Sequence, residues 1–173
     1  MNGRSIRFLS EEQLLAECRV DTYRGSGPGG QKRNKTSNSI RVTHLPTGIS
    51  AIAEESRSQA ENRMRAIRRL RLKLAVELRE PVDPLHWEPP DWFVSIRHHG
   101  RIDASYRHPY YAPTAGLILD LLKAVHGSPA DVGVMLGVPT TTVIRFLENE
   151  PMFWTAANRI RAELGLPALR HRE

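Results

Sequence analysis

The sequence predicts an α+β protein in which a small antiparallel sheet with a covering helix is followed by an α-helical module with a helix-turn-helix-like pattern. Stretches in which apolar and polar side chains alternate, as they do in strands, lie before residue 54. A long helical pattern begins at Ser58, and capping residues separate apolar stretches after residue 114. We therefore expect three parts: residues 1–80 with the sheet, residues 81–113 as a connector rich in proline and aromatic residues, and residues 114–173 as the helical module.

The first part is expected to contain three short strands. They lie at residues 19–23, 39–44 and 49–53, the last two joined by the turn Leu-Pro-Thr-Gly. Ser10 and Gln13 have the spacing of a capping box and predict a preceding helix that runs to about Cys18. The polar residues 31–38 are expected to form a short helical turn.

A second capping box, Ser58 with Glu61, opens a helix that should run to about Arg79 and stop before Pro81. Its apolar stripe should cover the sheet and consists of Ala60, Met64, Ile67, Leu70, Leu74 and Leu78. Four cations lie off the stripe: Arg65, Arg68, Arg69 and Lys73. Two interpretations of them stay open, a solvated helix face or contacts with phosphate groups.

The connector holds six of the twelve prolines and most of the aromatic residues: Trp87, Trp92, Phe93, Tyr106, Tyr110 and Tyr111. So many rings predict an ordered segment whose aromatics pack on protein. Stacking on nucleic-acid bases is the alternative.

The helical module contains a helix-turn-helix pattern. Ser128 and Pro129 have the types expected at an N-cap and a first helical position. Gly133, Gly137 and Val143 then occupy the small, turn-glycine and buried-aliphatic positions. Acidic residues outnumber basic ones between residues 127 and 150, which favours helix packing or docking over DNA reading.

Charge is distributed unevenly along the chain. The net charge is +6, yet residues 1–80 hold 16 Lys and Arg against 9 Asp and Glu, and the remainder holds 9 against 10. No acidic residue lies between Asp21 and Glu54. A basic segment of this kind indicates a polyanionic partner, since phosphate contacts release counterions.

This basic segment contains the stretch RGSGPGGQKRNKT at residues 24–36. A phosphate-binding P-loop is one interpretation, but Gly25 and Gly30 are followed by Gln31, Lys32 and Arg33, so the register fails. A structural glycine turn explains neither the glutamine nor the cations. The remaining interpretation is a loop that enters a reaction centre built largely by another molecule.

The stretch Gly29-Gly30-Gln31, in GSGPGGQKRNKTSNSIRVTHLPTGI and followed by EESRSQAENR, resembles the catalytic GGQ domain of class I peptide chain release factors. It is similar to the small ribosome-rescue peptidyl-tRNA hydrolases built on that domain. The resemblance spans about residues 12 to 80. It implies hydrolysis of the ester between nascent peptide and P-site tRNA in the peptidyl-transferase centre of the ribosome.

The resemblance assigns catalysis to Gly29, Gly30 and Gln31. The glycines would give a thin backbone with free φ, the Gln31 N–H would stabilise developing negative charge, and the Gln31 side chain would admit water. Contacts to large-subunit rRNA phosphates would come from Arg24, Lys32, Arg33, Lys35, Arg41 and Arg57.

Two departures from the family shape the functional expectation. Only 23 residues precede the loop, so we expect no codon-reading domain, and residues 81–173 lack the basic tail of the small rescue factors. We therefore expect codon-independent peptide release or ribosome rescue, with the helical module docking on the ribosome or a protein partner. The alternatives are a non-catalytic adaptor that recruits a partner through this module and, third, a DNA-binding regulator.

Composition bounds the remaining expectations. Hydrophobic residues make up 40% of the chain and mean hydropathy is −0.43. No stretch approaches the roughly 18 apolar residues of a membrane span, and Cys18 is the single cysteine. The histidines show no zinc-site spacing. We expect a cytoplasmic monomer that has no membrane contact, metal or cofactor.

Overall fold

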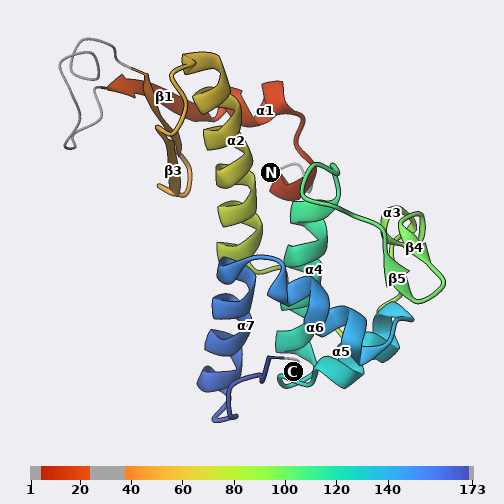
Figure 1. The fold of residues 1–173 in the computed structure, drawn as a ribbon. Coiled ribbons are helices and arrows are strands. Elements are labelled where there is room, and N and C mark those ends of the chain that lie inside the picture. Colours follow the sequence, from red (N-terminus) through yellow and green to blue (C-terminus); the bar gives the residue numbers. More distant parts are fainter. Residues whose placement is uncertain (1–4, 24–37, 172–173) are drawn as a thin grey trace. The chain divides into compact units, whose positions relative to one another are not determined.

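The computed structural model describes residues 5–23 and 38–171, which divide into two compact units between Leu74 and Ala75. The α+β prediction is confirmed (Figure 1). The first unit contains a three-stranded antiparallel sheet, and the second contains four helices longer than one turn together with a short two-stranded hairpin.

Two short helices precede the sheet, η1 (Ile6–Phe8) and α1 (Glu11–Ala16). The predicted capping box opens α1: the Ser10 hydroxyl accepts from the Gln13 N–H, and the Gln13 side chain accepts from the Ser10 N–H. This reciprocal bonding satisfies two of the donors that a helix start leaves free. The helix ends two residues before the predicted Cys18, because Cys18 already belongs to the first strand.

The sheet has the order β1-β2-β3, with strands β1 (Cys18–Tyr23), β2 (Ser39–His44) and β3 (Ser50–Ala53). Val20, Val42 and Ala51 lie opposite one another across the three strands, so they share one face. Ile40, Val42, Ala51 and Ala53 are buried on this face, whereas Arg41 and Ile52 on the other face are exposed. This alternation is typical of an antiparallel sheet packed on one side.

Helix α2 (Gln59–Glu77) supplies the other half of the first core and runs alongside the sheet (Figure 1). Ala66, Ile67, Leu70 and Leu74 are buried. The predicted stripe is wrong at its beginning, since Ala60 is exposed and the Met64 side chain is 58% exposed. The first turn of α2 lies over polar loop backbone, and the residue buried there is the polar Asn62.

In the second unit, the segment after α2 is fixed to α4 (Tyr111–Ala124). The buried Asp120 carboxylate lies 2.9 Å from the Arg79 guanidinium and accepts from the Glu80 N–H at 3.1 Å. Arg79 also donates to the Gly116 carbonyl. These bonds take the chain out of helical geometry, which explains why α2 ends at Glu77 and not at about Arg79.

The connector contains helix α3 (Asp91–Val94) and a hairpin of β4 (Arg97–His98) and β5 (Arg101–Ile102). Its rings pack on protein: Trp92 lies 5.3 Å from Tyr110 between centroids and 5.9 Å from Phe93.

Helix α4 packs against each of α5 (Pro129–Leu136), α6 (Thr140–Glu148) and α7 (Pro151–Glu163). The rings of Tyr111, Phe146 and Phe153 meet where α4, α6 and α7 come together, with centroids 5.4 to 5.9 Å apart. The helix-turn-helix prediction holds. Helices α5 and α6 bend by 108° at a turn where Gly137 has a φ of 66°, and Val143 is fully buried.

Among the described residues, none of the helices taken singly is long and apolar enough to cross a membrane. The bent pair α5–α6 meets that length and composition criterion only when its two helices are counted together.

Candidate active site

The predicted catalytic segment connects two paired strands. Tyr23 at the end of β1 lies opposite Ser39 at the start of β2, so the intervening chain leaves the sheet and returns to it at neighbouring positions. Most of the predicted site residues belong to that intervening chain and lie outside the described residues: Arg24, Gly29, Gly30, Gln31, Lys32, Arg33 and Lys35. The expected helical turn at 31–38 falls there too, apart from Asn38. The structure therefore shows the residues that flank the segment on either side, Tyr23 on β1 and Asn38 and Ser39 at the start of β2, which we call the loop base.

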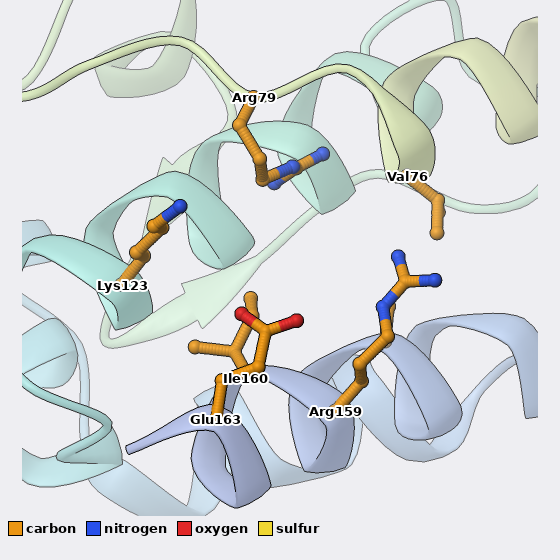
Figure 2. A pocket seen from close by; sticks show the side chains of 7 residues that line it. Val76, Arg79, Lys123, Arg159, Ile160 and Glu163 are labelled. Carbon is orange, nitrogen blue, oxygen red and sulfur yellow. The ribbon is translucent and has the colours of Figure 1, made fainter.

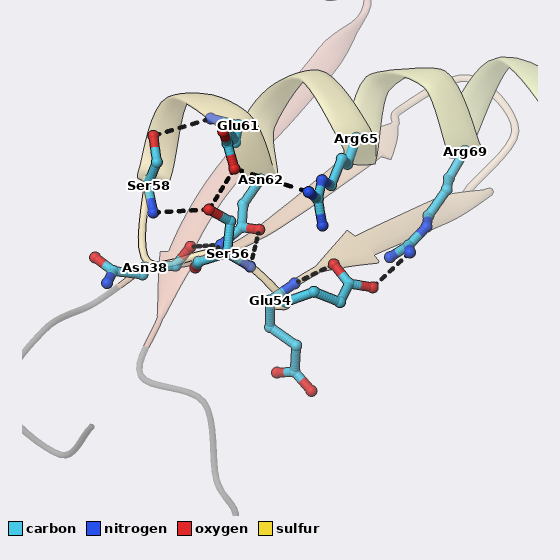
Figure 3. Close-up of polar contacts among 9 residues, drawn as sticks. Asn38, Glu54, Ser56, Ser58, Glu61, Asn62, Arg65 and Arg69 are labelled. Atoms are coloured by element: carbon cyan, nitrogen blue, oxygen red, sulfur yellow. Dashed lines mark hydrogen bonds and ion pairs between the residues drawn. The ribbon is translucent and has the colours of Figure 1, made fainter.

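Asn62 in the first turn of α2 organises this base (Figure 3). Its side chain is fully buried, and its amide nitrogen donates to the Asn38 carbonyl at 2.7 Å and to the Ser56 carbonyl at 2.8 Å. The side-chain oxygen accepts from the Ser56 N–H at 3.0 Å. One side chain thus joins Asn38, which directly precedes β2 and follows the predicted catalytic segment, to the chain that leads into α2.

The start of α2 differs in detail from the predicted capping box. The Ser58 hydroxyl accepts from the Glu61 N–H at 3.3 Å, as predicted. The Glu61 carboxylate, however, accepts from the Ser56 hydroxyl, and it is this hydroxyl that accepts from the Ser58 N–H at 3.0 Å. Ser56 therefore relays the second half of the cap and is held in place by both Glu61 and Asn62 (Figure 3).

Two predicted RNA-binding residues are described, and both are exposed. The Arg41 guanidinium lies 5.3 Å from the centroid of the Tyr23 ring, a cation–π contact at the end of β1. Arg57 lies between Ser56 and Ser58 in the loop before α2. The structure thus places one cation on each of the two chain segments that Asn62 joins.

Two of the four cations that lie off the predicted stripe of α2, Arg69 and Lys73, contact the sheet. Arg69 donates to the Ile52 carbonyl and Lys73 to the Ser50 carbonyl, both on the edge strand β3 and both at 2.7 to 2.8 Å. These carbonyls point away from β2, so the two side chains cap the unpaired edge of the sheet. Arg69 also pairs with Glu55 and, as a hydrogen-bond donor, holds the pKa of that carboxyl below its usual range.

Cys18 on β1 does not suit a nucleophilic role. Burial, and secondly the neighbouring Glu17 carboxylate, raise the pKa of its thiol, which keeps the thiol protonated near neutral pH. The buried His44 on β2 is held by hydrogen bonds on both ring nitrogens, to Glu17 at 2.9 Å and to Thr47 at 2.8 Å.

A hollow of about 220 Å³ in the second unit offers little chemistry (Figure 2). Its cations are Arg79, Lys123 and Arg159. Asp120 pairs with Arg79, Glu77 lies 3.8 Å from Arg159, and Glu163 lines the hollow itself, so positive and negative charges balance. Within residues 5–23 and 38–171, no three His, Cys, Asp or Glu side chains gather as a metal site would require.

The part of the chain that matches known proteins contains the sheet and the predicted catalytic segment. Residues 12–84 match the family model described as the RF-1 domain. Residues 12–84 are an RF-1 domain. The domain includes the Gly29-Gly30-Gln31 tripeptide, all three strands of the sheet, helix α2 and Asn62.

Individual relatives agree with this assignment. The RF-1 domain region is 54% identical over 59 residues to peptide chain release factor 2 of Paramagnetospirillum magneticum, and 53% identical over 58 residues to release factor 1 of Ureaplasma parvum. It is 51% identical over 69 residues to release factor 1 of Malacoplasma penetrans. These alignments cover 34 to 38% of this chain and 16 to 19% of the relatives, so the chain corresponds to under a fifth of a release factor.

Sequence reasoning assigned no separate role to Asn62, although it lies in the motif R-S-Q-x-x-N that carried the resemblance. The available signal was a short amide in the first turn of a helix at a position that helical spacing places on the buried side. Its partners are three backbone groups from two segments, at Asn38 and at Ser56, and the contact with Asn38 is one that no local pattern reveals.

Proposed function

We propose that this protein hydrolyses the ester of peptidyl-tRNA in the peptidyl-transferase centre of the ribosome, and does so without reading a codon. The observation that carries the proposal is the Gly29-Gly30-Gln31 tripeptide inside an RF-1 domain whose loop base is fixed by Asn62. Relatives over this domain are peptide chain release factors.

The reaction needs no nucleophile from the protein. Water attacks the ester carbonyl, the carbonyl oxygen becomes negatively charged, and the ribose oxygen of the tRNA leaves with a proton. The protein has to position the water and supply a donor where charge develops. In the proposed mechanism the Gln31 N–H is this donor, the Gln31 side chain limits the pocket to water, and Gly29 and Gly30 let the backbone enter a narrow RNA cavity.

Cations around the loop would hold it in the ribosome. Arg41 and Arg57 are exposed next to the loop base, and they would join the four cations of the segment itself in contacting rRNA phosphates. Such contacts position a protein on RNA without reading its sequence. The helical unit would take the place of codon recognition and select the ribosomal state. Because the protein would act on ribosomes, the cytoplasm is its proposed site of action.

The test is release of labelled peptide from purified ribosomes that hold peptidyl-tRNA in the P site. Three complexes are compared, with an empty A site, a sense codon and a stop codon. We expect the protein to release peptide equally fast from the stop-codon and the sense-codon complexes. A preference for the stop codon would contradict codon independence, and ribosome binding without release on any complex would favour the adaptor.

Gln31→Ala and Gly30→Ala separate the two parts of the mechanism. Gln31→Ala keeps the backbone N–H, so we expect slower hydrolysis and a larger share of attack by added small nucleophiles such as hydroxylamine. Gly30→Ala adds bulk and restricts φ, so release should fall by about 100-fold or more, comparable to the loss of an oxyanion donor. Equal effects of both variants would contradict the separate roles.

A further inference from the structure

The β4–β5 hairpin of the second unit ends in a tight two-residue turn. His99 and Gly100 connect the strands and have φ values of 49° and 74°. Positive φ at both positions is the pattern of a type I′ turn, whose twist matches that of the strands. The turn places His98 and His99 at the exposed tip of the hairpin, with Arg101 at the start of the returning strand.

This hairpin is bonded to the helix-turn-helix. The Arg97 guanidinium donates to the Leu136 carbonyl at the end of α5 at 2.9 Å, and the Thr142 hydroxyl of α6 donates to the Gly100 carbonyl at 2.8 Å. A methyl group added to Gly100 would lie 3.1 Å from the Pro139 ring, so the turn also packs on the start of α6. The hairpin and α6 therefore form one continuous surface.

Exposed side chains from both elements line this surface. We define the hairpin–α6 face by His98, His99, Arg101, Thr141 and Arg145. Thr141 and Arg145 are four residues apart on α6, hence on the same side of the helix, and opposite the buried Val143 and Phe146.

The two arginines of the face have no structural task in the described part of the chain. No carboxylate of residues 5–23 or 38–171 lies within 4.0 Å of Arg101 or Arg145. Some other arginines of the unit do have partners: Arg79 pairs with Asp120, and Arg161 donates to the Pro167 carbonyl. Exposed cations that neither cap nor pair are available to a ligand.

The acidic residues nearest in sequence to this face are Asp103, Asp131, Glu148 and Glu150. Glu148 at the far end of α6 lies 3.3 Å from the His171 ring, and Glu150 accepts from the Tyr111 hydroxyl at 3.5 Å. Asp131 lies in the first turn of α5, and Asp103 lies beyond the open end of the hairpin, away from its tip. Asp131 and Asp103 lie outside the hairpin–α6 face. Glu148 follows Arg145 by three residues and therefore lies on the same side of α6. Its carboxylate contacts His171 and is not within 4.0 Å of Arg145.

We propose that the hairpin–α6 face binds the sugar-phosphate backbone of double-helical RNA. Arg101 and Arg145 would contact phosphates, and the Thr141 hydroxyl would bond a phosphate or a 2′-hydroxyl. The deep, narrow major groove of A-form RNA excludes a helix, so the contact would run across the shallow minor groove and follow shape more than sequence. The choice of RNA over DNA rests on the proposed ribosomal function.

The experiment measures binding of the full chain to a fluorescein-labelled RNA hairpin of about 16 base pairs by anisotropy, over a series of salt concentrations. Arg101→Ala/Arg145→Ala removes two phosphate contacts. We expect Kd to rise about tenfold and the slope of log affinity against log salt to shrink by about 1.4 to 1.8. Arg101→Lys/Arg145→Lys should retain most of the affinity, because a phosphate contact needs the charge.

The matched control is Arg159→Ala/Arg170→Ala, which removes the same charge from α7 and the C-terminal segment of the same unit; there we expect a change in Kd below about twofold. Equal losses in both double variants, or a DNA duplex of the same sequence bound more tightly than the RNA, would overturn the proposal. Gly30→Ala should bind the RNA like the wild type. Failure of peptide release with intact RNA binding would then overturn the proposed function alone.

Discussion

At the scale of single residues, Asn62 shows why an amide and not a carboxylate occupies the loop base. The site offers two carbonyl acceptors and one N–H donor, and an asparagine side chain has two donors and one acceptor group to match them. A carboxylate would place negative charge against two carbonyl oxygens. An apolar side chain would remove all three of these hydrogen bonds.

The first prediction concerns Asn62→Ala and Asn62→Asp. Asn62→Ala should lower the free energy of unfolding of the first unit by about 2 to 4 kcal/mol, since it removes three hydrogen bonds, each with a net contribution of about 0.5 to 1.5 kcal/mol. Asn62→Asp buries a charge, so its cost should grow as pH rises above the pKa of an unfolded aspartate, about 4. Hydrogen exchange of α2 measures both. A change no larger than that of the exposed control Arg63→Ala would contradict the role of Asn62.

A second prediction follows from the lowered pKa of Glu55. A carboxyl whose pKa is lower in the folded than in the unfolded state stabilises the fold above its unfolded pKa, and this stabilisation is lost as pH falls through the folded pKa. The Glu55 and Arg69 side chains are 43% and 39% exposed, so solvent screening keeps the coupling below about 1 kcal/mol.

A double-mutant cycle of Glu55→Gln and Arg69→Met measures that coupling and cancels the bond from Arg69 to the Ile52 carbonyl. We expect the coupling to be present at pH 7 and to vanish on acidification below the usual glutamate pKa of 4.5. A coupling that stays constant between pH 7 and pH 3 would contradict the ion pair.

At the scale of elements, the turn between α5 and α6 depends on close backbone approach. A methyl group added to Gly133 would lie 2.7 Å from the Val138 carbonyl oxygen, which is backbone and cannot move aside cheaply. Gly165 has a φ of 71°, but the space around it is open. Alanine substitution at Gly133 therefore tests steric crowding, and alanine substitution at Gly165 tests backbone strain.

Gly133→Ala should cost about 2 to 3 kcal/mol through overpacking, whereas Gly165→Ala should cost about 1 kcal/mol through strain alone. All three tryptophans lie in the second unit, so urea unfolding followed by tryptophan fluorescence reports its stability. An equal or smaller loss for Gly133→Ala would show that this backbone contact relaxes readily and does not fix the geometry of α5 and α6.

Elements with local signals were predictable from the sequence. The SIRVTH alternation located β2 at its observed bounds, and Ser10 and Ser128 located two helix starts, because side-chain period and capping are local physics. The β4–β5 hairpin escaped prediction since its strands have two residues each and its turn has His99 where Asn, Asp or Gly is usual. Asn62 and the edge-capping Lys73 escaped because their partners are distant in sequence.

At the scale of the whole molecule, the chain combines an RF-1 domain with a helical unit that carries its own candidate RNA-binding face. The cations divide by task. Some cap or pair within a unit, as Arg69, Lys73 and Arg79 do, and others are exposed on the two proposed RNA-binding surfaces, as Arg41, Arg57, Arg101 and Arg145 are. Under the proposed function, the first unit would carry out the hydrolysis and the second would select the ribosomal state.

Hydrolysis at the Gly29-Gly30-Gln31 tripeptide can be tested by single-turnover release of peptide from ribosomes with an empty A site, comparing wild type with Gly30→Ala at saturating protein. We expect the wild type to release peptide about 100-fold or more faster than Gly30→Ala, with both proteins bound to the ribosome. Equal release rates, or none by the wild type when ribosome binding is demonstrated, would contradict hydrolysis at the Gly29-Gly30-Gln31 tripeptide.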